Sequence, residues 1–181
     1  MDKVSPNNRQ SIHYPLHAAP FRQCLERETF LSVQTWKDEA TIHLRLFQDG
    51  YPTPKGCLLN ASRWTILVDH LTVIEEEMTK VQSGSSNIEY KVHLGGNVYA
   101  TVTSPYVILD IRLHFTQDGK LLPTRKGVTL RFPGLIQLKQ CISRVYDAIP
   151  RTHPCYMIHQ NAQDEMAALT CKECSPNTYM L

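Results

Sequence analysis

Two short phrases of this sequence carry residue types that suit contacts with single-stranded nucleic acid. The chain reads PTPKG at residues 52–56 and PTRKG at residues 123–127. Each phrase comes just after a Gln-Asp-Gly, and each is preceded by a strand-like run that contains one arginine, Arg45 or Arg112. Sequence-neutral binding of a single strand needs cations along the phosphates and aromatic faces for the bases. These two places are therefore the first candidates for such chemistry.

The two phrases belong to a longer internal repeat. The segment that begins FLSVQTW aligns with the one that begins VYATVTS, in the order strand, strand, turn, short strand and helix. The QDG at 48–50 aligns with the QDG at 117–119, and the KG at 55–56 with the KG at 126–127. Because these features match in register, the sequence predicts two copies of one structural unit.

The strands are predicted from period-two alternation. Ile42, Leu44 and Leu46 share one face of a strand, and His43 and Arg45 share the other. The second copy repeats the pattern, with Leu109, Ile111 and Leu113 opposite Asp110, Arg112 and His114. Each sheet should therefore have one apolar and one polar face, as antiparallel sheets commonly do.

The helices are predicted from three-four spacing of apolar residues. The pattern indicates helices at 61–78 and 133–149, the first with Asn60 as its N-cap. A further strand at 88–94 opens the second copy. Its counterpart in the first copy is expected somewhere in residues 12–25.

The repeat resembles the DNA-binding domain of the transcriptional coactivator called positive cofactor four. The second copy shows this in LDIRLHFTQDGKLLPTRKGVTL and QLKQCISRVYDAI, and the first in FLSVQTWKDE, HLRLF, PTPKG and LNASRW. The resemblance spans roughly residues 27–149. It implies an α+β fold in which a curved four-stranded antiparallel sheet precedes one helix. Units of this family pair through their helices and hold single-stranded or melted DNA, so the chain is expected to form an intramolecular pseudodimer and to be a monomer.

The predicted organisation has five parts. They are an N-terminal arm at 1–26, a first coactivator-like repeat at 27–80, a linker at 81–87, a second repeat at 88–150 and a C-terminal tail at 151–181.

The resemblance and the binding chemistry together select the candidate site residues. Trp36 and Lys37 match the family's aromatic-lysine pair, and Phe115 matches a stacking aromatic that follows the strand-end arginine. The predicted nucleic-acid-binding residues are Trp36, Lys37, Arg45, Phe47 and Lys55 in the first copy, and Arg112, Phe115, Lys120, Arg125 and Lys126 in the second.

Several features depart from the family pattern and leave alternatives open. Pro54 stands where the second copy has Arg125, so the first copy is less basic. Leu135 stands where the first copy has Trp64. Trp36 could be a packing residue, and both strand-end arginines could form structural ion pairs. Two alternative functions are open. The protein could bind RNA on the same sheets, or it could be a protein-interaction scaffold without nucleic-acid affinity.

The tail contains thiols and imidazoles that could hold a metal. Cys171 and Cys174 have the two-residue spacing of one edge of a zinc tetrahedron, and His153 or Cys155 together with His159 could supply the rest. This spacing alone is weak evidence, and the expectation is no cofactor. An interaction tail for transcription or replication proteins is the alternative.

The overall composition excludes some classes of protein. The net charge is only +2, so a nucleic-acid site must be a local patch. No GxSxG, HExxH, P-loop or dinucleotide motif occurs, and we expect no enzyme.

No secretory signal or membrane-spanning run is seen. The expected location is intracellular, and nuclear by the resemblance. A cellular and a viral source are both open.

Overall fold

The alternating runs form two antiparallel sheets with the same strand order. The computed structural model describes residues 21–36 and 39–149. The first sheet has the order β1-β2-β3-β4 and the second the order β5-β6-β7-β8, each a simple meander. The strands are β1 Phe21–Glu26, β2 Thr29–Trp36, β3 Glu39–Gln48, β4 Tyr51–Leu59, β5 Glu89–Gly95, β6 Val98–Thr103, β7 Leu109–Gln117 and β8 Lys120–Leu130.

A helical segment follows each sheet. Helix α1, Ala61–Gln82, begins at the predicted N-cap, where Asn60 Oδ1 accepts a hydrogen bond of 2.9 Å from the Arg63 N–H. It runs four residues beyond the predicted end at 78. The single helix expected at 133–149 is two helices, α2 Phe132–Gln140 and α3 Ile142–Ala148, with Cys141 between them. The predicted α+β class, two four-stranded sheets each followed by helix, is confirmed.

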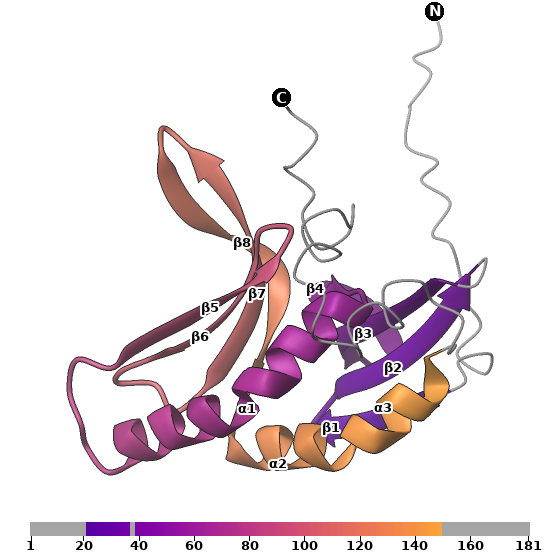
Figure 1. The fold of residues 1–181 in the computed structure, drawn as a ribbon, viewed down its shortest axis with the longest axis horizontal. Coiled ribbons are helices and arrows are strands. Elements are labelled where there is room, and N and C mark those ends of the chain that lie inside the picture. Colours follow the sequence, from indigo (N-terminus) through magenta and orange to yellow (C-terminus); the bar gives the residue numbers. More distant parts are fainter. Residues whose placement is uncertain (1–20, 37–38, 150–181) are drawn as a thin grey trace, which may run out of the picture.

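The helices cross from one unit to the other. α1 packs on β5 and β6 of the second sheet, while α2 and α3 pack along β1 of the first. Figure 1 shows α1 running between the two sheets, with α2 and α3 beneath β1 and β2. α1 and α2 also contact each other, and Lys139 of α2 forms an ion pair with Glu75 of α1. Each sheet is thus covered in part by helix from the other half of the chain.

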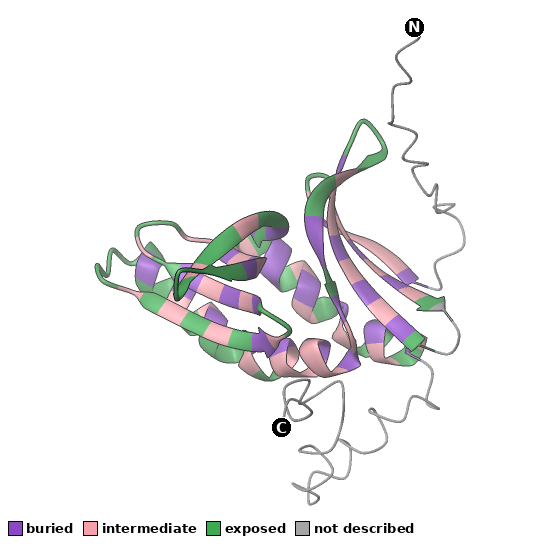
Figure 2. Cartoon of the chain, turned by 90° about the horizontal axis from the view of Figure 1, so that it is seen from above, coloured by how far each residue is buried: buried purple, intermediate pink, exposed green. Residues whose placement is uncertain are grey.

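A single apolar core joins the two units. Along the strands, buried residues alternate with more exposed ones (Figure 2). Trp64 and Leu67 of α1 are fully buried, as are Leu135 and Leu138 of α2. Burial of apolar surface stabilises a fold by about 25 cal/mol per Å². Because residues of both units contribute to the same cluster, the halves stabilise each other.

The first strand lies at the end of the range in which it was expected. β1 occupies Phe21–Glu26, so the last residues of the segment assigned to the N-terminal arm belong to the first sheet. β1 also reaches the second unit, because Glu26 Oε1 accepts a hydrogen bond of 2.7 Å from the Arg131 N–H. A carboxylate at this position satisfies a free N–H at the start of α2 and suits the positive end of the helix dipole.

Candidate nucleic-acid interface

The first Pro-Thr-x-Lys-Gly phrase forms a hydrogen-bonded corner beside β3. Three residues of β4, Thr53 to Lys55, lie opposite the single residue Leu46, which makes a bulge at the sheet edge. Thr53 Oγ1 donates to the Leu46 carbonyl at 2.7 Å and accepts from the Lys55 N–H at 3.2 Å. Arg45 Nη1 donates to the Thr53 carbonyl at 2.8 Å. The threonine therefore holds the bulge, and the arginine closes it.

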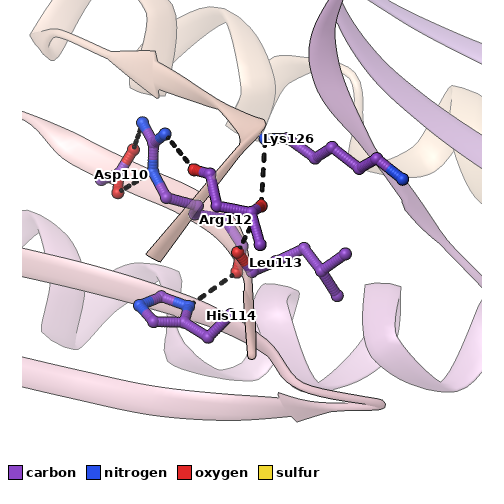
Figure 3. Close-up of polar contacts among 6 residues, drawn as sticks. Asp110, Arg112, Leu113, His114 and Lys126 are labelled. Carbon is purple, nitrogen blue, oxygen red and sulfur yellow. Dashed lines mark hydrogen bonds and ion pairs between the residues drawn. The ribbon is translucent and has the colours of Figure 1, made fainter. Parts of the chain in front are cut away.

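The second phrase forms the same corner. Thr124 Oγ1 donates to the Leu113 carbonyl at 2.7 Å and accepts from the Lys126 N–H at 3.0 Å. Arg112 Nη1 donates to the Thr124 carbonyl at 2.8 Å (Figure 3). The three hydrogen bonds match those of the first unit atom by atom. The repeated phrase is therefore explained first as a structural element that shapes the edge of each sheet.

The glycine of each phrase is required by close backbone approach. A Cβ atom on Gly56 would lie 2.7 Å from the Leu44 carbonyl oxygen. A Cβ atom on Gly127 would lie 2.8 Å from the Ile111 carbonyl oxygen. Side chains at either position would collide with the neighbouring strand. The adjacent lysines, Lys55 and Lys126, are exposed.

The two strand-end arginines have different neighbours. Arg112 forms a bidentate ion pair with Asp110, with distances of 2.9 Å to Oδ2 and 2.8 Å to Oδ1 (Figure 3). This hydrogen bonding raises the pKa of Arg112. In the first unit His43 stands at the position of Asp110. Burial first, and then the charge of Arg45, lowers the pKa of His43 to about 4.

The charge of Arg45 is consequently less neutralised than that of Arg112. Among residues 21–36 and 39–149, Arg45 forms no ion pair. The alternative of a structural ion pair thus applies to Arg112 alone, and both arginines also hold the corner.

An aromatic cluster lies on the outer face of the first sheet, the face opposite its buried side. The Phe30 and Phe47 rings meet edge to face, with their centroids 5.1 Å apart. The guanidinium carbon of Arg22 lies 4.2 Å from the Phe30 centroid and 4.6 Å from the Phe47 centroid. Such contacts are favourable because the ring face is electronegative. We call Arg22, Phe30 and Phe47 the first aromatic cluster.

The second sheet has an equivalent cluster built from different residues. Tyr99 stacks on His93 at 4.6 Å between ring centroids and meets His114 edge to face at 4.9 Å. Lys91 Nζ lies 4.5 Å from the Tyr99 centroid. We call Lys91, His93, Tyr99 and His114 the second aromatic cluster.

Strand register establishes that the clusters correspond. Phe30 pairs with Arg45 across β2 and β3, and Tyr99 pairs with Arg112 across β6 and β7. Each cluster also has a residue two positions after its arginine, Phe47 or His114. The backbone N–H of both donates to a turn carbonyl at 2.8 Å, that of Glu28 for Phe47 and that of Asn97 for His114.

The predicted aromatic residues lie in different places and differ in exposure. Phe47 joins the first cluster, but the residue is only 9% exposed, so it supports Phe30 and Arg22 more than it offers a stacking face of its own. In the second unit His114 occupies the position equivalent to Phe47, and Phe115 follows it. Phe115 points to the opposite face of β7, where it is 42% exposed. Trp36 ends β2, and Lys37 lies outside the described residues.

Most of the remaining predicted cations lie at the corners. Lys55, Lys120, Arg125 and Lys126 are all exposed, and Arg45 is partly buried where it closes the first corner. Arg125 lies at the tip of the second bulge, and Pro54 lies at the tip of the first. Lys55, Arg125 and Lys126 thus lie at the two corners, whereas Lys120 lies at the far end of the β7–β8 hairpin, where it pairs with Gln117.

Sequence reasoning missed most of the two aromatic clusters. Arg22, Phe30, Lys91, His93, Tyr99 and His114 were not among the predicted site residues. The available signal was the pairing of one aromatic residue with each strand-end arginine. It could be used only once the register between neighbouring strands was known.

The decisive comparison concerns the second unit, where a known sequence family matches β7, β8 and α2. The family is described as Transcriptional Coactivator p15 (PC4). The match covers residues 106–141, about a fifth of the chain. It includes Arg112, Thr124, Lys126 and Gly127, the residues of the second corner. The second unit is therefore similar in sequence to the coactivator p15 family, in agreement with the resemblance of its LDIRLHFTQDGKLLPTRKGVTL segment.

Other comparisons add little. No curated protein matches the chain. Among solved structures, "Crystal structures of trypanosoma bruciei MRP1/MRP2" matches at 10% identity over 77% of this chain and 79% of that one, with a TM-score of 0.28. At that TM-score the likeness carries no conclusion about function.

The metal candidates Cys155, His159, Cys171 and Cys174 lie outside the described residues. Within the described ranges, no group of three or more metal-binding side chains is assembled. None of the helices in that part of the chain is long and apolar enough to cross a membrane.

Proposed function

We propose that the protein binds single-stranded DNA across the outer faces of its two sheets and acts as a transcription cofactor or a replication accessory. The observation that carries the proposal is the doubled pairing of a cation with an aromatic cluster beside a strand-end arginine. Base stacking contributes about 1–3 kcal/mol per base and does not depend strongly on sequence. Binding would therefore be largely sequence-independent.

The similarity to the coactivator family supports this choice of ligand. The residues that the family match shares with the site include Arg112 and Lys126, and the first unit repeats their geometry with Arg45 and Lys55. Two equivalent sites on one chain form an intramolecular pseudodimer that could follow one strand. Neutralised phosphates release counterions, so affinity should fall steeply with salt.

The first test is a fluorescence-anisotropy titration. The probes are a labelled DNA strand of about 20 nucleotides, long enough for a site of ~4–16 nucleotides per unit, the RNA strand of the same sequence, and the DNA duplex. We expect the DNA strand to bind most tightly. Preference for the RNA strand would favour the alternative of an RNA-binding protein, and absence of binding at low salt would favour a protein-interaction scaffold.

Point variants locate the site. Tyr99→Leu, which keeps an apolar side chain, should weaken binding by about five- to 100-fold with little change in salt dependence. Lys126→Ala should reduce the slope of log affinity against log salt by about one. Lys80→Ala is the matched control, because Lys80 is exposed on α1 and belongs to neither cluster. If Lys126→Ala and Lys80→Ala behave alike, the proposed interface is misplaced.

A further inference from the structure

The helix that follows each sheet begins against a turn of the other unit. In both units the third residue of the helix makes this contact. Arg63 of α1 lies against Gly95 and Gly96, in the turn between β5 and β6. Gly134 of α2 lies against Glu26, in the turn between β1 and β2. The two units are thus joined by two helix-to-turn contacts of the same kind.

Strand register shows that the two turns are equivalent, although their residues are not. Glu26 and Gly95 each end the first strand of their sheet, and a register shift precedes each of them. At the first turn, the strand supplies a carboxylate and the helix a glycine, Gly134. At the second turn, the strand supplies a glycine and the helix the guanidinium of Arg63. Equivalent places therefore carry opposite charges.

The guanidinium of Arg63 fills space that glycine leaves at the turn. A Cβ atom on Gly96 would overlap Arg63 Nη2 and lie 2.7 Å from its Cζ, and one on Gly95 would lie 3.7 Å from its Nε. The carboxylate of Glu26 already accepts a hydrogen bond from a backbone N–H. Arg63, in contrast, forms no ion pair within residues 21–36 and 39–149. Its charge is therefore available to a ligand.

The turn that holds this guanidinium adjoins the second aromatic cluster. His93 lies two residues before Gly95, and Tyr99 lies two residues after Asn97. The Asn97 carbonyl accepts a hydrogen bond of 2.8 Å from the His114 N–H. Because a strand rises about 3.3 Å per residue, the cation lies roughly one nucleotide from the rings of the cluster.

The same guanidinium also lies near the first corner. Cys57 comes just after the first phrase, and burial, aided by the charge of Asp110, raises the pKa of its thiol to about 12. The charges of Arg45, Arg112 and Arg63 oppose this rise. The strands that carry the two corners, β4 and β8, are in contact. Arg63 is therefore a third arginine in the region where the two units meet.

We propose that Arg63 binds a phosphate of the single strand at the turn between β5 and β6, so that a residue of the first unit completes the binding face of the second. A guanidinium presents a planar fork of donors that fits phosphate oxygens. The first unit has no equivalent contact, because Gly134 and Glu26 occupy the matching places. The inference rests on the proposed single-strand binding and adds a contact that makes the two faces unequal.

The test measures how binding of the full chain to a labelled DNA strand of about 20 nucleotides depends on salt. Arg63→Met keeps a long unbranched side chain in the turn but removes the charge. We expect its slope of log affinity against log salt to fall by about one, and its affinity at low salt to fall about tenfold. Arg63→Lys keeps the charge and should retain most of the slope. Lys80→Ala is again the control.

These variants separate a phosphate contact from a packing role. Thermal melting followed by circular dichroism shows how far each change disturbs the fold. A wild-type slope in Arg63→Met would overturn the inference. Equal losses of slope in Arg63→Met and Arg63→Lys would also overturn it, because the charge would then not be the cause.

A second measurement needs no variant and so does not depend on folding of the substituted chains. Phenylglyoxal modifies accessible arginines, and mass spectrometry reports the extent at each position. We expect Arg63 to react in the free protein and to be protected by saturating single strand, while Arg144, exposed on α3, stays reactive. An unreactive Arg63, or one that the strand does not protect, would overturn the inference. Failure of the proposed function is distinct, because the wild type would then not bind the single strand at all.

Discussion

The two units share one corner but differ in what surrounds it. Threonine, lysine and glycine take the same positions in both, and the three hydrogen bonds of each corner agree in their atoms. The partner of the arginine does not agree. Arg112 has the carboxylate of Asp110, whereas Arg45 has the imidazole of His43 and forms no ion pair among the described residues.

This difference distinguishes residues that the fold requires from surface residues that can vary. Thr53 and Thr124 satisfy backbone groups at a bulge, and the glycines beside them admit the neighbouring strand. Neither requirement depends on the ligand. The positions that differ are at the surface: Pro54 against Arg125, and a short hairpin against an extended one. In two units of the same topology, the identical positions indicate structural requirements, and the divergent positions are those at which the two outer faces differ.

The largest predicted effect tests whether the corners are equivalent. Gly56→Ala and Gly127→Ala should each lower the free energy of unfolding by about 2–4 kcal/mol, because the new methyl group meets a backbone oxygen that cannot move aside. Urea denaturation measures the change. Similar losses would support equivalence, and a tolerated change at one glycine only would show that the two corners differ in their packing.

The turn glycines give a matched comparison for that experiment. Gly50 and Gly119 have positive φ of 82° and 72° but open space around them. Alanine there should cost only about 1–2 kcal/mol, from the left-handed backbone alone. If Gly56→Ala costs no more than Gly50→Ala, close approach of the strands is not the reason for the glycine in the phrase.

The elements that the sequence predicted correctly are those that depend on local patterns. The alternation of Ile42 and Leu44 with His43 and Arg45 placed β3 and its faces, since a period of two fits a half-buried strand and does not fit a helix. Asn60 was identified as an N-cap because its side chain satisfies an N–H three residues away. β1 was harder to place. Its buried residues, Phe21 and Leu25, are four apart, and a register shift near Leu25 breaks the alternation.

The features that were missed depend on long-range geometry. Phe30 and Tyr99 belong to the candidate site because each lies across from a strand-end arginine, which requires the register between strands. α1 packs on the second sheet because the two units share one core. The apolar stripe of a helix predicts that it packs against something, but it does not identify the sheet. Phe115 was selected by the family resemblance alone, and only the register shows that His114 is the equivalent of Phe47.

The next prediction concerns the pH dependence of stability, which should follow from His43, the neighbour of Arg45 at the position of Asp110. With a pKa of about 4 in the folded protein against 6.5 when unfolded, His43 binds a proton more readily in the unfolded state. Stability should therefore be fully present above about pH 6.5 and fall as the pH drops toward 4, by on the order of 1–2 kcal/mol after allowance for solvent screening.

Variants at His43 show whether this residue is the source. His43→Gln should flatten the dependence of unfolding free energy on pH between about 4 and 6.5. His43→Asp should do the same and give Arg45 the carboxylate that Arg112 already has. An unchanged pH dependence in His43→Gln would mean that other groups control the acid sensitivity of the fold.

The smallest predicted effect comes from exchanging the one residue that differs between the phrases PTPKG and PTRKG. Pro54 and Arg125 lie at the tips of equivalent bulges, and both are exposed. Pro54→Arg should leave stability within about 0.5 kcal/mol of wild type, because it changes neither core nor ladder. It should steepen the slope of log affinity for single-stranded DNA against log salt by about one, through one more phosphate contact.

The reverse exchange, Arg125→Pro, completes the comparison. It should reduce the same slope by about one, and the double exchange should restore the wild-type value if the bulge tips face the strand in equivalent ways. Equal and opposite changes would mean that the two units hold the backbone alike and differ only in charge. A loss at Arg125 without a gain at Pro54 would mean that the strand follows the second unit more closely than the first.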